Sequence, residues 1–267
     1  MGKLMKHELR SYWKTFLPLW GAMLVLSVIN GLTLRGVDGS FFTQGIPMIV
    51  FGSVVLACGV LTLVLVLQRF YQGLLGSEGY LVLTLPLSRR QILGAKLLSA
   101  VLVEMLSLLA AAASCALLAI LATRAKPEGL KLFFEMLNVT FEDMPKESWL
   151  AVLMVFELVL MAILAAAEKT LHMYAAMSIG HLAKKQRIAL SMVAYVAINV
   201  VGTQLLALLI RAAGKLDLHF PWDYSDFVSS LGSMCTSLAG VMLLELAACA
   251  ALWAVSEYIL KKKLNLE

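Results

Sequence analysis

Charged side chains are scarce in this chain of 267 residues. Asp, Glu, Lys and Arg together make up 15% of it, whereas 61% of its residues are hydrophobic. Soluble domains are on average about one quarter charged and about half apolar, so this composition excludes an ordinary soluble domain. The apolar residues form runs of about 20 or more, enough to cross a hydrocarbon core about 30 Å thick. Because these runs take up most of the chain, a separate soluble catalytic domain is excluded as well.

Sequence motifs for nucleotide, metal and acyl chemistry are also missing. The chain has no glycine-rich loop ending in Gly-Lys-Ser/Thr, so it cannot hold nucleotide phosphates in a P-loop. It has no His-Glu-x-x-His, no paired aspartates and no Gly-x-Ser-x-Gly. Its 4 histidines are scattered along the chain, which argues against a shared metal site. We therefore predict that the chain is not an enzyme and binds no cofactor or metal itself.

Cysteine is rare, with 4 residues in the whole chain. All of them fall within apolar runs, and none has a close partner at metal-ligand spacing. A disulfide framework is therefore not expected, and buried reduced thiols are predicted instead. The residues are Cys58, Cys115, Cys235 and Cys249.

The apolar runs predict an all-α membrane protein that forms a single transmembrane domain, 1–267. An amphipathic helix at the membrane interface, 1–14, comes first, with cations that reach towards the headgroups. Six spans follow, at 15–34, 46–68, 91–122, 149–180, 188–210 and 231–260. The predicted inner segments carry about twice as many Lys and Arg as the outer ones, so both termini are expected in the cytoplasm.

The segment 69–90, RFYQGLLGSEGYLVLTLPLSRR, is the one long connection on the basic side of the membrane. Its glycines permit tight turns, and Pro86 disfavours helical geometry at Leu85, so short helices separated by bends are expected. Apolar residues such as Phe70 and Tyr71 can pack on a protein surface or lie among lipid headgroups. Composition alone fits a plain basic loop that sets topology equally well.

The stretch GSEGYLVLTLPLSRRQILGAK, from Gly76 to Lys96, resembles the cytoplasmic loop of bacterial permease subunits of the type-2 ABC transporter family. The opening MGKLMKHELRSYWKTFLPLWG is similar to the start of these permeases, and the span pattern extends the likeness over nearly the whole chain. Family members often have an acidic residue before the glutamate, where this chain has Ser77. The resemblance implies the permease subunit of an ATP-driven exporter in the bacterial cell membrane.

The resemblance also implies partners and contact residues. The partners would be separate ATPase subunits, which hold ATP and Mg²⁺, and a second permease copy or a related chain. A second contact with the ATPase would lie at the short basic turn with His181, Lys184 and Lys185. Substrate, direction of transport and the choice between homodimer and heterodimer stay open. The residues of the coupling loop assigned to the ATPase interface are Phe70, Tyr71, Glu78, Gly79, Tyr80, Leu85, Pro86, Arg89 and Arg90.

Glu104, Glu157 and Glu245 are the acids that lie deepest in the apolar runs. By insertion scales, a charged residue at a helix centre costs about 3 kcal/mol, so each should face a partner helix, water or a cavity rather than lipid. In one interpretation they line a transport path, and in the other they form hydrogen bonds between helices. An ion-coupled carrier or channel that uses these glutamates is therefore the alternative function.

Overall fold

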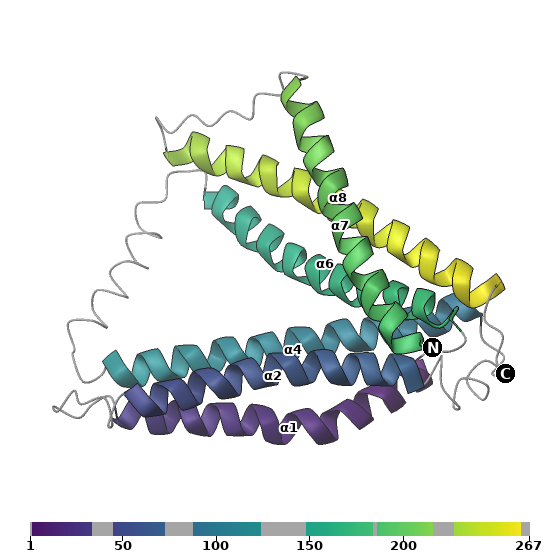
Figure 1. Ribbon diagram of the computed structural model, residues 1–267. Helices are drawn as coiled ribbons and strands as arrows, with labels where there is room; N and C mark the ends of the chain where they lie inside the picture. Colours follow the sequence, from purple (N-terminus) through teal and green to yellow (C-terminus); the bar gives the residue numbers. More distant parts are fainter. Residues whose placement is uncertain are drawn as a thin grey trace. The chain divides into compact units, whose positions relative to one another are not determined.

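The computed structural model describes residues 2–33, 45–72, 88–123, 148–183, 186–215 and 227–262. Within these ranges the chain is helical and forms no strand, which confirms the all-α prediction (Figure 1). The helices are α1 (Gly2–Thr33), α2 (Ile46–Phe70), α4 (Arg89–Thr123), α6 (Ser148–Gly180), α7 (Arg187–Lys215) and α8 (Phe227–Lys262).

Among the described residues, 5 helices are long and apolar enough to cross a membrane. They are Tyr12–Thr33, Ile46–Phe70, Arg90–Ala122, Arg187–Leu205 and Met234–Lys261. α6, which corresponds to the predicted span 149–180, is 33 residues long and is not among the five. The sixth span therefore stays a prediction.

α1 is one continuous helix of 32 residues, which covers the predicted interfacial helix, 1–14, and nearly all of the predicted span, 15–34. Aromatic contacts run along the helix across the predicted boundary. The rings of Trp13 and Trp20 meet edge to face with centroids 5.7 Å apart, and those of Phe16 and Trp20 lie 5.9 Å apart. These contacts stabilise the helix through the boundary, so no turn separates the two parts.

α4 begins at Arg89, two positions before the predicted span 91–122, because a capping box starts it. The backbone N–H of Gln91 donates to the Ser88 hydroxyl at 3.3 Å, and the backbone N–H of Ser88 donates to Oε1 of Gln91 at 3.1 Å. Ser-x-x-Gln is a local start signal that can be read from the sequence, and it satisfies two backbone donors that the helix leaves unpaired.

The chain divides into two compact units. Unit 1 contains Val66–Val101 and Glu147–Glu267, and unit 2 contains Gly2–Leu65 and Leu102–Lys146. The boundaries fall inside α2 and α4. The last turn of α2 and the first turns of α4 therefore belong to the same unit as α6, α7 and α8.

Within unit 2, α1 and α4 run in the same direction. Nε1 of Trp20 donates to Oγ of Ser107 at 3.2 Å, and further along both helices Gly31 lies against Leu121. A Cβ atom on Gly31 would stand only 2.5 Å from that of Leu121, so glycine allows the close approach. The buried side chains of α1 include Met23, Ser27 and Asn30.

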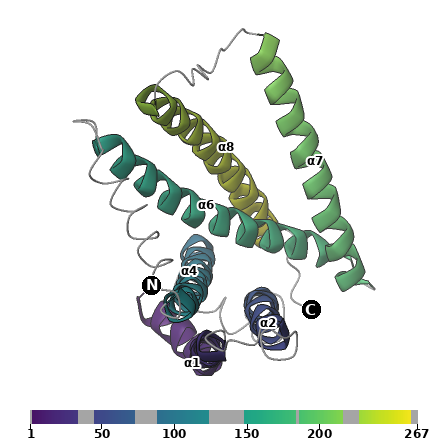
Figure 2. The ribbon, with the colours of Figure 1, turned by 90° about the vertical axis from the view of Figure 1, so that its left-hand side faces the viewer.

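Within unit 1, α6 and α7 form an antiparallel hairpin (Figure 2). His172 of α6 contacts Tyr195 of α7, with ring centroids 4.8 Å apart, and nearer the turn Gly180 faces Ser191. The amide of Asn199, one turn beyond Tyr195, also lies 3.3 Å from Nε2 of His172. Successive membrane spans have to alternate in direction, and this pair does.

α6 and α8 lie alongside each other and run parallel. The Cys235 thiol donates to the backbone carbonyl of Leu150 at 3.9 Å, and the Cys249 thiol donates to that of Leu164 at 4.0 Å. Both cysteines are free, as predicted. Because α6 contacts both of its neighbours, it is the central helix of unit 1. Its C-terminal half is buried on almost every side, through Ala166, Thr170, Leu171, Met173, Tyr174, Ala175, Ala176 and Ser178.

Candidate functional site

The two ends of the predicted coupling loop meet residues of α6 and α8 in unit 1. We call this group the stem cluster, because it holds the stems from which the loop extends. The loop residues Glu78, Gly79, Tyr80, Leu85 and Pro86 lie outside the described residues, as do Lys184 and Lys185 of the basic turn. The stem cluster consists of Arg69, Phe70, Tyr71, Arg90, Lys96, Tyr174, His181 and Glu257.

The first contact of the stem cluster is an aromatic stack at the end of α2. The ring of Phe70 lies flat on that of Tyr174 of α6, with centroids 3.8 Å apart and planes inclined by 13°. Both side chains are only 1% exposed. Such pairs contribute about 0.5–1.5 kcal/mol beyond the area they bury. Although the sequence assigns Phe70 to the ATPase interface, its burial makes it an anchor for the stem rather than part of an exposed surface.

Tyr174 also contacts α4, the second stem. Its hydroxyl donates to the backbone carbonyl of Lys96 at 3.5 Å, and Nζ of Lys96 donates to the backbone carbonyl of Arg69 at 3.4 Å. Both bonds are long, but Lys96 is nearly fully buried. The Arg69 carbonyl lies in the last turn of α2, where carbonyls lack helical partners and the helix dipole favours a cation. The two stems are thus joined to each other and to α6.

A third contact ties α4 to α8. Arg90, in the first turn of α4, forms an ion pair with Glu257 of α8. The Arg90 side chain is 73% exposed and that of Glu257 is 18% exposed, so solvent screens the pair. A pair of this kind contributes at most about 1 kcal/mol to stability. The pair links the first turn of α4 to α8.

Tyr71 follows α2 in a wider π-type turn, and its ring meets His181 edge to face with centroids 6.5 Å apart. His181 lies in the turn after α6. Its Nδ1 is buried and has no hydrogen-bond partner among the described residues. Burial, and secondly the nearby Arg187, lower the pKa of His181 below its ordinary value of 6.5. The imidazole is therefore neutral at pH 7. Of the three residues predicted to form a second contact with the ATPase, His181 is the one that the structure describes.

The lowered pKa of His181 predicts a loss of stability in acid. Because the unfolded chain binds the proton more readily, the contribution of His181 is fully present above the unfolded pKa, about 6.5, and is lost as the pH falls below it. Thermal unfolding of wild type and His181→Gln at pH 7.5 and 5.5 measures this effect. We expect the drop in Tm on acidification to be smaller in His181→Gln, and equal drops would contradict the assignment.

The three glutamates of the apolar runs divide between the units, and Glu104 is buried whereas Glu157 and Glu245 are half-buried. Glu104 lies on α4 in unit 2, whereas Glu157 and Glu245 lie on α6 and α8 of unit 1. Oε2 of Glu157 and Oε2 of Glu245 are buried and have no hydrogen-bond partner among the described residues. Glu157 interacts with the Cys235 thiol, and Glu245 interacts electrostatically with Glu168. The structure therefore places two of the three acids on one pair of neighbouring helices.

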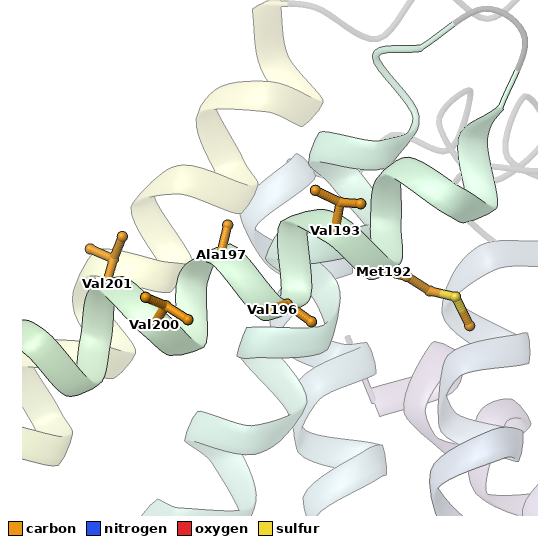
Figure 3. Close-up of a pocket in the computed structure, with 6 residues that line it drawn as sticks. All are labelled: Met192, Val193, Val196, Ala197, Val200 and Val201. Carbon is orange, nitrogen blue, oxygen red and sulfur yellow. The ribbon is translucent and has the colours of Figure 1, made fainter.

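An apolar groove runs along one face of α7 (Figure 3). All of its lining residues come from this one helix and recur at helical spacing, so it is an exposed helix face rather than an enclosed chamber. It presents no polar group for chemistry, and lipid chains or another apolar helix are the surfaces that match it. The residues are Met192, Val193, Val196, Ala197, Val200 and Val201.

Comparison of the chain with family models, curated proteins and solved structures finds no match. The site therefore has to be interpreted from its own residues. Among the described residues, no group of three or more His, Cys, Asp or Glu side chains is arranged to hold a metal ion. The stem cluster joins the end of α2 and the start of α4 to α6 and α8.

Sequence reasoning did not assign a role in the site to Tyr174 or Glu257. A weak signal exists for Tyr174, which is the one aromatic residue in the run HMYAAMS and lies near the predicted inner end of a span. A large ring among small residues suggests a specific packing partner. Nothing in the local sequence indicates that Glu257 pairs with Arg90, because the two residues are 167 positions apart.

Proposed function

We propose that this protein is the permease subunit of a bacterial ATP-driven exporter of the type-2 ABC family. It lies in the cell membrane with six spans and with both termini in the cytoplasm. Separate ATPase subunits hydrolyse ATP, and this chain has no nucleotide site of its own. Two permease subunits, identical or related, enclose the substrate path.

The observation that carries the proposal is the anchoring of both loop stems. The motif-bearing segment leaves α2 beside the Phe70–Tyr174 stack and returns to α4 beside the Arg90–Glu257 ion pair. A loop that only set membrane topology would need basic residues but neither of these contacts. A loop that transmits work needs fixed ends, because close-packed groups pass on a displacement that a free segment would absorb. The anchored stems therefore favour a coupling role.

The carrier or channel function is supported by a different observation, the buried and unpartnered Oε2 atoms of Glu157 and Glu245 among the described residues. A carboxyl group in this setting can take up or release a proton during transport. The two functions differ in their energy source. The permease needs ATP hydrolysis by its partner, whereas the carrier works with a proton gradient alone.

The coupling role is tested with Glu78→Gln and Tyr80→Ala. The wild-type protein, purified from its native membrane, is expected to bring an ATPase with it and to stimulate ATP hydrolysis in proteoliposomes. Each substitution is expected to weaken ATPase binding about 30-fold or more and to reduce the stimulation of hydrolysis with it, because a hot-spot residue of an interface contributes about 2 kcal/mol or more. Glu135→Gln, in the predicted outer segment, is the matched control and should leave both unchanged. Unchanged ATPase binding and unchanged stimulation in both loop variants would show that the loop takes no part in coupling. Transport that needs a proton gradient and no nucleotide would favour the carrier.

A further inference from the structure

We infer that Tyr174 is a positioning residue through which movement of the two loop stems reaches α6. This inference rests on the proposed function. It adds a residue outside the loop, on a helix that neither the motif nor the resemblance implicates. It also assigns α6 as a receiver of the movement.

Tyr174 is the point at which both stems meet α6. Its ring covers Phe70 at the end of α2, and its hydroxyl donates to the Lys96 carbonyl in α4. The hydrogen bond from Nζ of Lys96 to the Arg69 carbonyl joins the two stems directly. A shift of either stem therefore displaces an atom in contact with Tyr174.

The two residues of α6 that follow Tyr174 have small side chains. Ala175 and Ala176 are buried, and neither side chain extends beyond Cβ. Tyr174 itself is among the largest fully buried side chains of the described residues. Removing its ring would leave a gap between α2 and α6, and the surrounding structure of a close-packed site relaxes only partly into such a gap. Contact between stem and helix would be interrupted at this one position.

The ring matters more than the hydroxyl. The bond from the Tyr174 hydroxyl to Lys96 is 3.5 Å long, beyond the usual range for hydroxyl donors, whereas the ring stack is close and nearly parallel. Tyr174→Phe keeps the stack and removes only the hydroxyl, and Tyr174→Leu removes the ring. The two variants therefore separate the effect of the stack from that of the hydrogen bond.

A purely structural role and a positioning role make different predictions. If the stack only stabilised the fold, its loss would lower ATPase binding, ATP hydrolysis and movement together. If it positions α6, ATPase binding and hydrolysis persist while α6 no longer responds to nucleotide. The response can be read at Trp149, an exposed residue near the other end of α6.

The experiment uses the permease with its co-purifying ATPase in proteoliposomes. Trp149→Cys carries an environment-sensitive fluorophore, and Cys115→Ala removes a native cysteine that the fluorophore could also label. ATP with vanadate is expected to change the emission. In Tyr174→Leu this change should fall at least fivefold, while bound ATPase and hydrolysis stay within about twofold of wild type. Tyr174→Phe should respond like wild type. Phe70→Leu removes the other ring of the stack and should show the same loss of the emission change. If Tyr174→Leu does not fold, Phe70→Leu tests the inference in its place.

The outcomes separate the inference from the proposed function. An undiminished emission change in either Leu variant overturns the inference and leaves the proposed function intact. Parallel loss of ATPase binding and emission change in both Leu variants shows a structural stack and also overturns the inference. If no ATPase accompanies the wild-type protein, the proposed function fails, and the inference fails with it.

Discussion

Replacing Phe70 by alanine is expected to lower the free energy of unfolding by about 3–5 kcal/mol. The Phe70 side chain is 1% exposed and lies in van der Waals contact with the ring of Tyr174. Truncation removes buried area and leaves a cavity at the point where α2 ends. Equilibrium unfolding of the purified protein by denaturant in detergent micelles measures the change.

The matched control is Phe156→Ala on α6. The Phe156 side chain is 63% exposed, so the same truncation creates no cavity. We expect its effect to stay below about 1 kcal/mol, as for substitutions away from buried features. Equal losses in the two variants would contradict the buried stack, and with it the anchoring of the first stem.

Gly180→Ala is expected to destabilise the protein by about 1–3 kcal/mol, although alanine is the better helix former. Gly180 ends α6 against the start of α7. A Cβ atom there would stand 2.6 Å from the backbone nitrogen of Ser191 and 2.7 Å from the backbone oxygen of Arg187. Because backbone atoms cannot rotate away as a flexible side chain can, the helices would have to separate. Thermal unfolding of the purified variant checks this.

Two further substitutions define what causes that effect. Gly59→Ala, on α2, introduces a Cβ that meets nothing within 4 Å, so this variant should be as stable as wild type or slightly more so. Ser191→Ala removes the hydroxyl that also crowds Gly180. Combined with Gly180→Ala, it should not restore stability, since the backbone contacts remain. Full rescue would show that the hydroxyl was the only obstacle.

The position of Gly180 also bears on the proposed mechanism. The tight turn after α6 brings His181 to Tyr71 at the start of the loop, and it brings α7 onto the buried half of α6. A wider turn would loosen both contacts together. Movement received at Tyr174 would then reach α7 less directly, because α7 would no longer touch α6 closely near this turn.

The helices themselves could be predicted from the sequence because a bilayer imposes both length and internal hydrogen bonding on whatever crosses it. The apolar runs predicted the start of α2 at Ile46 correctly and those of α6 and α7 to within one residue. The apolar run predicts the start of α4 two residues late, because the Ser88–Gln91 capping box that starts the helix is a polar signal outside that run. The apolar run predicts the end of α2 two residues early, because it stops before the charged Arg69, although a cation is well accommodated in the last turn of a helix.

Composition and run length are thus enough by themselves to predict a chain of long apolar helices, as the structure shows, and the Gly76–Lys96 motif predicts a coupling segment between two of them. Which side chains hold that segment was decided only by the tertiary structure. Tyr174 is 78 residues from Lys96 and Glu257 is 167 from Arg90, and hydropathy does not specify which helix faces meet over such separations. The same apolar pattern fits many helix arrangements, because a side chain gains as much from lipid as from another helix. Burial of Phe70 against Tyr174 depends on shape and close packing, which exist only once the helices have assembled.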